Sequence, residues 1–168
     1  MIKQLYLDIK TRLQSVVDAD GNRVFRHFDM WNRQPQFTQE QTGFDFPAIF
    51  VEFTPMVWST LGNRVQECEL NVRLHIVTEW HADTADYSPT EQRALEFLDI
   101  ADRMVCALQN FATPYMNSWM RSRSIIDHDH DTLVNNIEEY RCNLRDTGAV
   151  KKRVPVQAQF KLIESKTL

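Results

Sequence analysis

Residues 47–80 carry the clearest pattern in the chain and read PAIFVEFTPMVWSTLGNRVQECELNVRLHIVTEW. From Val65 to Thr78 apolar and polar residues alternate, as in a β-strand with one dry face and one wet face. The dry face carries Cys68, Leu70, Val72, Leu74 and Ile76, and the wet face carries Glu67, Glu69, Asn71, Arg73 and His75. Residues 47–53 are apolar at nearly every position, which is typical of a strand covered on both faces. Because Leu61-Gly62-Asn63 can form a turn between the two segments, they predict a long antiparallel hairpin.

Two helices are predicted on either side of this hairpin. Apolar residues at helical spacing predict an amphipathic helix from Ile2 to Val17. Ser88-Pro89-Thr90-Glu91 has the pattern of a capping box with proline at the first helical position, which predicts a helix from Pro89 to about Asn110. The inner face of this second helix is expected to carry Ala94, Leu98, Ala101, Val105 and Leu108.

The rest of the chain supplies further strands and one long polar loop, Asn32–Asp45, whose length suggests a functional or mobile segment. The additional predicted strands are Arg23–Trp31, Trp119–Ile126, Leu133–Arg145 and Val154–Ile163. The element order is then α-β-β-β-α-β-β-β. This order predicts a single α+β domain over residues 1–168, a two-layer sandwich in which two main helices cover one face of a mostly antiparallel sheet.

Composition excludes several classes of protein. The chain has 168 residues, 43% of them hydrophobic and 25% charged, which suits one globular domain. Its formal net charge is -4, so it lacks the charge of a general nucleic-acid binder, and we expect no direct nucleic-acid recognition. Charges at Lys3 and Asp8 argue against a signal peptide, and no apolar run approaches the ~20 residues of a membrane span. We therefore expect no membrane partner.

The cysteines and glycines are few and widely spaced. Three cysteines, Cys68, Cys106 and Cys142, form no Cys-x-x-Cys pair, so neither a disulfide framework nor a zinc cluster is expected, and a reducing compartment is favoured. The chain has four glycines, far apart, so a glycine-rich phosphate loop cannot be built from them. This argues against nucleotide-hydrolysing and dinucleotide-binding folds.

One stretch is a candidate for a reactive site, the run Asp-His-Asp-His-Asp at residues 127–131. Alternation would place His128 and His130 on one side of an extended chain, where imidazoles suit zinc. Two histidines do not close a metal site, and a third ligand would have to come from elsewhere, such as His75 or His81. A solvated turn explains the run more simply. Neither a nucleophile elbow nor another triad pattern is present, so the sequence nominates no catalytic residue and no cofactor.

Other charged side chains also have simpler explanations than a site. Glu67 and Glu69 share one strand face and could act as a carboxylate pair, but a solvated face accounts for them. The basic residues Arg121, Arg123 and 151–153 could bind phosphate, although charge in a hairpin turn also aids solubility and protects a sheet edge.

The order of elements resembles the tail terminator and tail-completion (neck) proteins of long-tailed bacteriophages and prophages. The resemblance lies in the opening helix Ile2–Val17, in the strand introduced by Phe46-Pro47-Ala48-Ile49, and in the strand ending in His75-Ile76-Val77 before the capped helix. The aspartate-rich turn 127–131, the strand with Tyr140-Arg141 and a final strand complete it. The Asn32–Asp45 loop and the four tryptophans have no counterpart that we can match to the family.

The resemblance implies a structural protein without an active site, hence no enzyme. Such a protein would form a ring, commonly a hexamer, that caps the tail tube and joins it to the head connector. It would be found in the bacterial host cytoplasm during assembly and then in the tail and neck of the virion. Its partners would be further copies of itself, the tail-tube protein and head-connector proteins. Expected interface residues are Trp31, Arg33, Trp58 and Trp80, because amphipathic anchors near strand ends suit such contacts.

Two alternatives remain open from the sequence. One is a small metal-dependent enzyme that uses His128 and His130. The other is a module that binds a small ligand or a peptide in a pocket between helix Pro89–Asn110 and the sheet, lined by residues such as Phe97 and Leu98.

Overall fold

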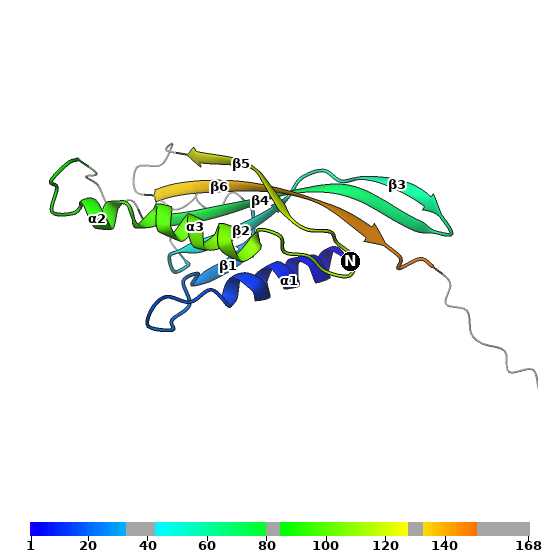
Figure 1. Cartoon of the computed structure of the whole chain (residues 1–168), viewed down its shortest axis with the longest axis horizontal. Coiled ribbons are helices and arrows are strands. Elements are labelled where there is room, and N and C mark those ends of the chain that lie inside the picture. The colour runs from blue at the N-terminus through cyan, green and yellow to red at the C-terminus, as the bar shows by residue number, and fades with distance from the viewer. Residues whose placement is uncertain (33–42, 80–84, 128–132, 151–168) are drawn as a thin grey trace, which may run out of the picture.

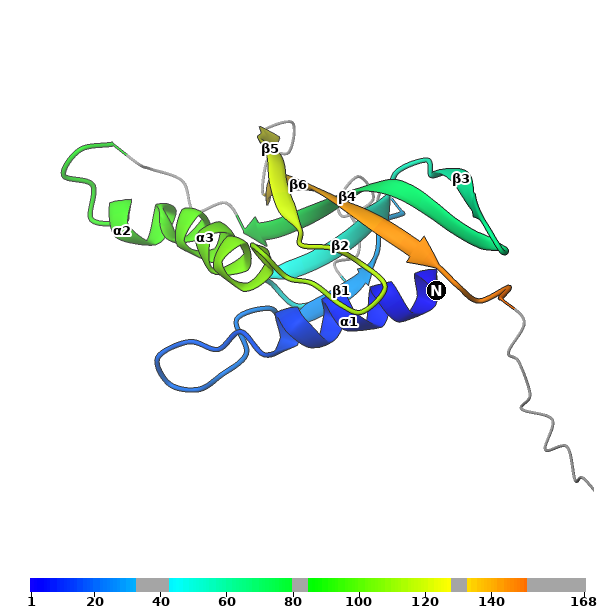
Figure 2. The ribbon, with the colours of Figure 1, turned by 45° about the vertical axis from the view of Figure 1, so that its right-hand side comes forward.

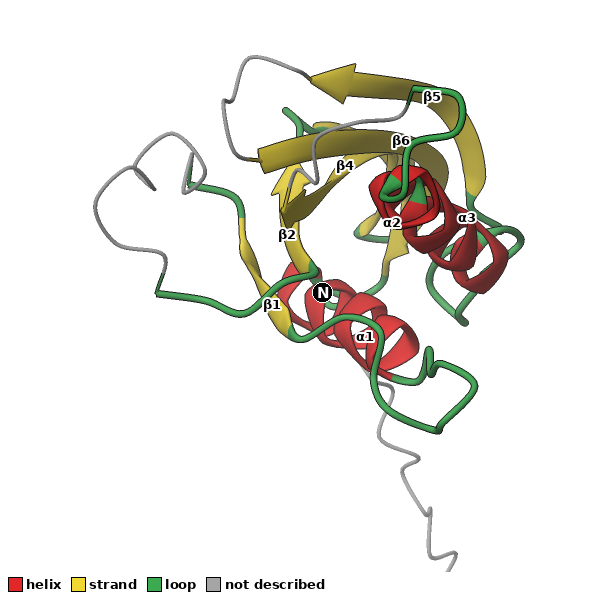
Figure 3. Cartoon of the chain, turned by 90° about the vertical axis from the view of Figure 1, so that its left-hand side faces the viewer, coloured by secondary structure: helices red, strands yellow, loops and turns green. Residues whose placement is uncertain are grey.

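A computed structural model of the chain describes residues 1–32, 43–79, 85–127 and 133–150. These residues form two layers, a six-stranded sheet and a layer of helices on one of its faces (Figure 1). Viewed from the end, α1 (Ile2–Gln14) and α3 (Glu96–Leu108) lie on the same side of the sheet (Figure 3). The predicted fold class is therefore confirmed: an α+β protein with a mostly antiparallel sheet and two main helices.

The sheet is built around its two longest strands. Its strands are β1 (His27–Met30), β2 (Ala48–Phe53), β3 (Val57–Gly62), β4 (Val65–Glu79), β5 (Met120–Asp127) and β6 (Leu133–Asp146). The order is β1-β2-β4-β6-β5, with β3 also paired to β4. Among the strand pairs of the described residues, β1–β2 is parallel and the others are antiparallel. β4 and β6 pair from Gln66↔Asp146 to Glu79↔Leu133, so they form the centre on which the other strands are placed.

The predicted hairpin has one more strand than the sequence indicated. The turn lies where it was expected, but it joins β3 to β4, and Asn63 and Arg64 adopt φ values of 49° and 64° there. Two consecutive residues with positive φ between paired strands are typical of a tight hairpin turn. β2 pairs with a different part of β4, Val72–Val77, so β2 and β3 share one edge of the same long strand. The predicted element order omitted β3 because its residues do not alternate regularly.

The second predicted helix is divided. It begins at Glu91 rather than at Pro89, and Leu95 separates the short helix α2 (Glu91–Ala94) from α3. The capping box does not form, because Ser88 Oγ accepts a hydrogen bond from the N–H of Thr90 and neither helix has a side-chain cap. The expected inner face is also shifted: Ala101, Met104 and Leu108 are buried, as is Ala94, whereas Leu98 is exposed. α1 ends at Gln14, three residues before its predicted end.

The main core lies between the helices and the sheet. All five residues predicted for the dry face of β4 are buried, and four of them, all but Cys68, belong to this core with Leu5, Ile9 and Leu13 of α1 and the inner face of α3. Trp119 and Tyr140 complete the core, with ring centroids 5.4 Å apart. Cys68 and Cys142 are buried in the same layer, and burial raises the pKa of the Cys142 thiol to about 12. All three cysteines are free, and Cys106 is exposed.

A smaller apolar cluster covers part of the opposite face of the sheet. Ala48, Phe50, Val77 and Leu133 are buried there, with Trp31, Phe44 and Phe46 packed against them. β2 is therefore covered on both faces, as its continuous apolar sequence predicted. The predicted final strand, Val154–Ile163, lies outside the described residues.

Candidate functional site

The face of the sheet that the helices leave uncovered carries a row of charged side chains across three strands. Strand register places Glu52 beside Arg73, and Arg73 beside Glu139. Arg73 Nε donates a hydrogen bond to Glu139 Oε1 at 2.7 Å, and its Nη1 lies 3.5 Å from Glu52 Oε2. The hydrogen bond to Glu139 is the main reason that the pKa of Arg73 is raised. The centre of the predicted wet face is thus occupied by cross-strand ion pairs.

His75 joins this row and is buried, although the sequence placed it on the wet face. Its Nε2 lies 3.2 Å from Glu52 Oε2, within hydrogen-bond distance. The indole of Trp31 stacks on the imidazole, with ring centroids 3.7 Å apart and an angle of 5° between the planes. Burial lowers the pKa of His75, and the hydrogen bond to Glu52 opposes part of that effect. We call Glu52, Arg73, His75 and Glu139 the sheet-face network.

The sheet-face network is poorly suited to catalysis. His75 is 4% exposed beneath Trp31, so its ring has little access to a substrate. Arg73 already contacts two carboxylates, which leaves little of its charge for an anionic ligand. Cross-strand pairs of this kind hold neighbouring strands in register. We interpret the network as the polar support of a surface rather than as a reactive centre.

The structure describes only some of the residues nominated as sites. Within the described ranges, no group of three or more His, Cys, Asp or Glu side chains is arranged to hold a metal ion. His128 and His130 lie outside those ranges, so the described residues test neither the solvated turn nor the metal-dependent alternative. Glu67 and Glu69 are exposed on the uncovered face, as a solvated pair would be.

The proposed basic patch is only partly described. Arg121 Nη1 lies 3.6 Å from Glu138 Oε2, which also accepts a hydrogen bond from Ser124 Oγ at 2.5 Å. Arg121 is therefore engaged with β6 rather than free to hold phosphate. Residues 151–153 lie outside the described part of the chain.

The two predicted interface tryptophans that the structure describes lie on opposite faces of the sheet. Trp31 stacks on His75 over the uncovered face, whereas Trp58 pairs across the strands with Cys68 and packs against the main core on the helix side. Both are partly buried. Arg33 and Trp80 lie outside the described residues.

Two edge strands, β3 and β5, each carry two exposed apolar side chains, and Met30 is exposed on the third edge strand, β1. Val57 and Leu61 of β3 are 84% and 51% exposed, and Met120 and Ile126 of β5 are 59% and 40% exposed. β3 and the facing part of β4 extend beyond the N-terminal end of α1 (Figure 2). We call residues 57–69 the arm. Sequence reasoning missed this feature because it did not recognise β3.

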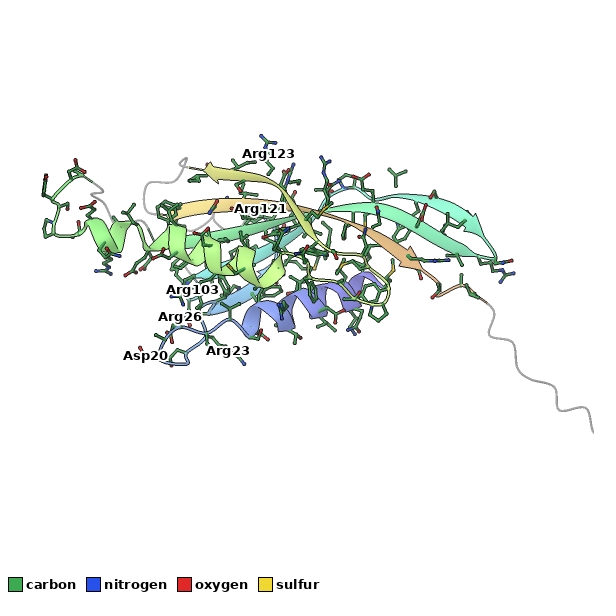
Figure 4. The ribbon with its side chains drawn as sticks, in the orientation of Figure 1. Asp20, Arg23, Arg26, Arg103, Arg121 and Arg123 are labelled. Carbon is green, nitrogen blue, oxygen red and sulfur yellow. The ribbon has the colours of Figure 1, made fainter. Side chains whose placement is uncertain are left out.

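The arm and β5 differ in the sign of their net charge, because the arm carries two glutamates and Arg64, and β5 carries two arginines and Asp127. Glu67 and Glu69 lie on the arm beside Ser59 and Val57, on the uncovered face of the sheet. Arg121 and Arg123 lie on β5 (Figure 4). Because β3 lies beyond β4 and β5 lies beyond β6, the two charged segments are at opposite edges of the sheet.

The described residues thus form a two-layer α+β fold with a polar network on the sheet face that the helices leave uncovered. No family model and no curated protein matches the chain. Among the helices of the described residues, none is long and apolar enough to cross a membrane.

Proposed function

We propose that the protein is a ring-forming structural component of a phage or prophage tail, which terminates the tail tube and joins it to the head connector. The resemblance in element order suggests this role, and the open edges of the sheet support it. Natural proteins usually protect exposed edge strands, because unpaired backbone groups invite pairing with another chain. Within the described residues, both β3 and β5 combine an edge that no further strand pairs with exposed apolar side chains, which is typical of surfaces that meet a partner.

A closed ring needs two different surfaces on each protomer that fit each other. We infer that the arm and β5 supply these two surfaces, because they lie at opposite edges, with Glu67 and Glu69 exposed on the arm and Arg123 exposed on β5. The pairs β3–β4, β4–β6 and β6–β5 are all antiparallel. If one protomer continues the sheet of the next, β5 and the neighbouring β3 therefore run antiparallel as well. The single observation that carries the proposal is this complementarity of the two open edges.

Solution mass, measured by light scattering across a concentration series with and without a tail-tube protein, tests the proposal. A ring of six copies would have a mass of about six times 19.8 kDa, or ~119 kDa. Val57→Lys and Met120→Lys should each reduce association, because both place a charge on an open edge without disturbing the core. Leu98→Lys is the matched control, since Leu98 is exposed on α3. A chain that remains at 19.8 kDa under every condition would overturn the proposal.

A further inference from the structure

A hollow of about 220 Å³ opens where the start of α3 faces the ends of β2 and β4. Phe46, Pro47, Phe97 and Ile100 form apolar walls, and Arg26, Glu79, Arg93 and Glu96 contribute charged groups. The hollow lies between the second helical region and the sheet, where the ligand-binding alternative placed its pocket. Phe97 lines it as that alternative expected, but Leu98 does not.

The buried hydroxyl of Thr78 is the observation that suggests a ligand in this hollow. It lines the hollow, it is only 6% exposed, and its hydroxyl has no hydrogen-bond partner among the described residues. A buried hydroxyl without a partner costs free energy, so such groups are usually hydrogen-bonded. A polar group of a molecule that enters the hollow would supply the missing partner.

The arginines around the opening make no ion pair with another described residue. A second hollow of about 440 Å³ shares Arg26, Pro47, Glu96 and Ile100 with the first. It adds Arg23 and Arg103, which lie with Arg26 near the C-terminal end of α1 (Figure 4). Within the described residues, none of the four arginines that line the two hollows has a carboxylate within 4.0 Å.

Acidic residues line the same hollows, but most of them have other compensation. Asp18 accepts hydrogen bonds from the N–H groups of Asp20 and Asn22, each at 2.9 Å, within its own loop. Glu96 and Asp99 lie in the first turn of α3, where the helix dipole favours negative charge. Arg103 acts electrostatically on Asp18, so Arg26 and Arg93 are the guanidinium groups that we expect an incoming anion to meet.

We propose that this hollow binds a ligand in which a carboxylate lies next to a bulky apolar group. The apolar group would occupy the space between Phe46 and Phe97, and the carboxylate would meet Arg26 and Arg93. A hydrogen-bonding group on the ligand would pair with the Thr78 hydroxyl. A free carboxylic acid and the C-terminal residue of a peptide share this chemistry. The proposal does not depend on ring formation.

The test is an NMR titration of the isotopically labelled full chain with millimolar N-acetyl-phenylalanine and with its neutral amide. The acid should shift the signals of residues that line the hollow, and the amide should bind at least about tenfold more weakly. Gly-Gly-Phe with a free C-terminal carboxylate, compared with its C-terminally amidated form, distinguishes a peptide end from a free carboxylic acid as the ligand. Tighter binding of the peptide identifies a peptide end, and tighter binding of the small acid identifies a free acid.

Three variants complete the test. Arg26→Gln should weaken binding of the acid by about tenfold. Thr78→Val should weaken binding while the protein stays at least as stable, because it removes a hydroxyl that has no partner. Arg141→Gln is the control, since Arg141 is exposed on β6 away from the hollow. No binding of either acid, equal binding of acid and amide, or wild-type affinity in both Arg26→Gln and Thr78→Val would overturn the proposal.

Discussion

Replacing Trp31 with alanine tests whether this side chain is what buries His75. Truncation of a fully buried tryptophan costs about 3–5 kcal/mol, and a stacked aromatic pair contributes ~0.5–1.5 kcal/mol beyond its buried area. Trp31 is partly buried and stacks on the imidazole at 3.7 Å. We therefore expect Trp31→Ala to lower the free energy of unfolding by about 2–3 kcal/mol, measured by urea denaturation at neutral pH.

The same substitution should change the titration of His75. Burial is the main cause that lowers the pKa of His75, so removal of the covering indole should raise that pKa toward its ordinary value. An NMR titration of the imidazole proton signals measures this, and the His75 signal is assigned by its loss in His75→Gln.

Trp58→Ala is the matched control for this experiment. Trp58 is also partly buried, but it packs on the helix side of the sheet, away from His75. The control should lose stability and leave the pKa of His75 unchanged. An unchanged His75 pKa in Trp31→Ala, or an equal change in Trp58→Ala, would refute the reasoning.

Three further predictions follow from the same structure. The free energy of unfolding should fall as the pH drops below about 6.5, because the unfolded chain then protonates His75 while the folded chain, with its lowered pKa, resists protonation. Urea titrations at about pH 7.5 and 5.5 should show that His75→Gln loses less free energy of unfolding between the two pH values than the wild-type protein does. Met104→Ala should cost about 2–5 kcal/mol in urea unfolding and Leu98→Ala less than about 1 kcal/mol, since only Met104 is buried. Elemental analysis should find no stoichiometric metal in the purified protein; a metal that is lost in His128→Ala/His130→Ala would instead favour the metal-dependent enzyme.

Regular alternation made much of the sheet predictable from the sequence. β4 and β6 are long, each buries one face, and the described structure places both close to their predicted bounds. β3 was missed because its exposed face carries Val57 and Leu61, so apolar residues do not mark its inner side. The break at Leu95 was missed because the sequence there lacks glycine and proline, the usual signals for a helix end.

The candidate surfaces were harder to predict, because they depend on pairing between distant segments. Sequence alone placed Arg73 and His75 on a wet face, but it did not show that Glu52 lies beside both of them. Glu52 is 21 residues from Arg73 in the chain. Only the strand register brings these side chains together, and the same holds for Trp31 above His75.

Two neighbouring residues of β6 link the centre of the sheet to its open edge. Glu138 faces the helices and binds Ser124 and Arg121 of β5, whereas Glu139 faces the other way and binds Arg73 of β4. A shift of one residue in the pairing of β6 would turn each carboxylate to the wrong face and break both sets of contacts. The contacts of Glu138 on the helix face thereby fix the register of β5 against β6. The contact of Glu139 on the opposite face fixes the register of β4 against β6. An edge strand held in this way keeps its outer backbone groups in a defined position, which is what a partner strand requires.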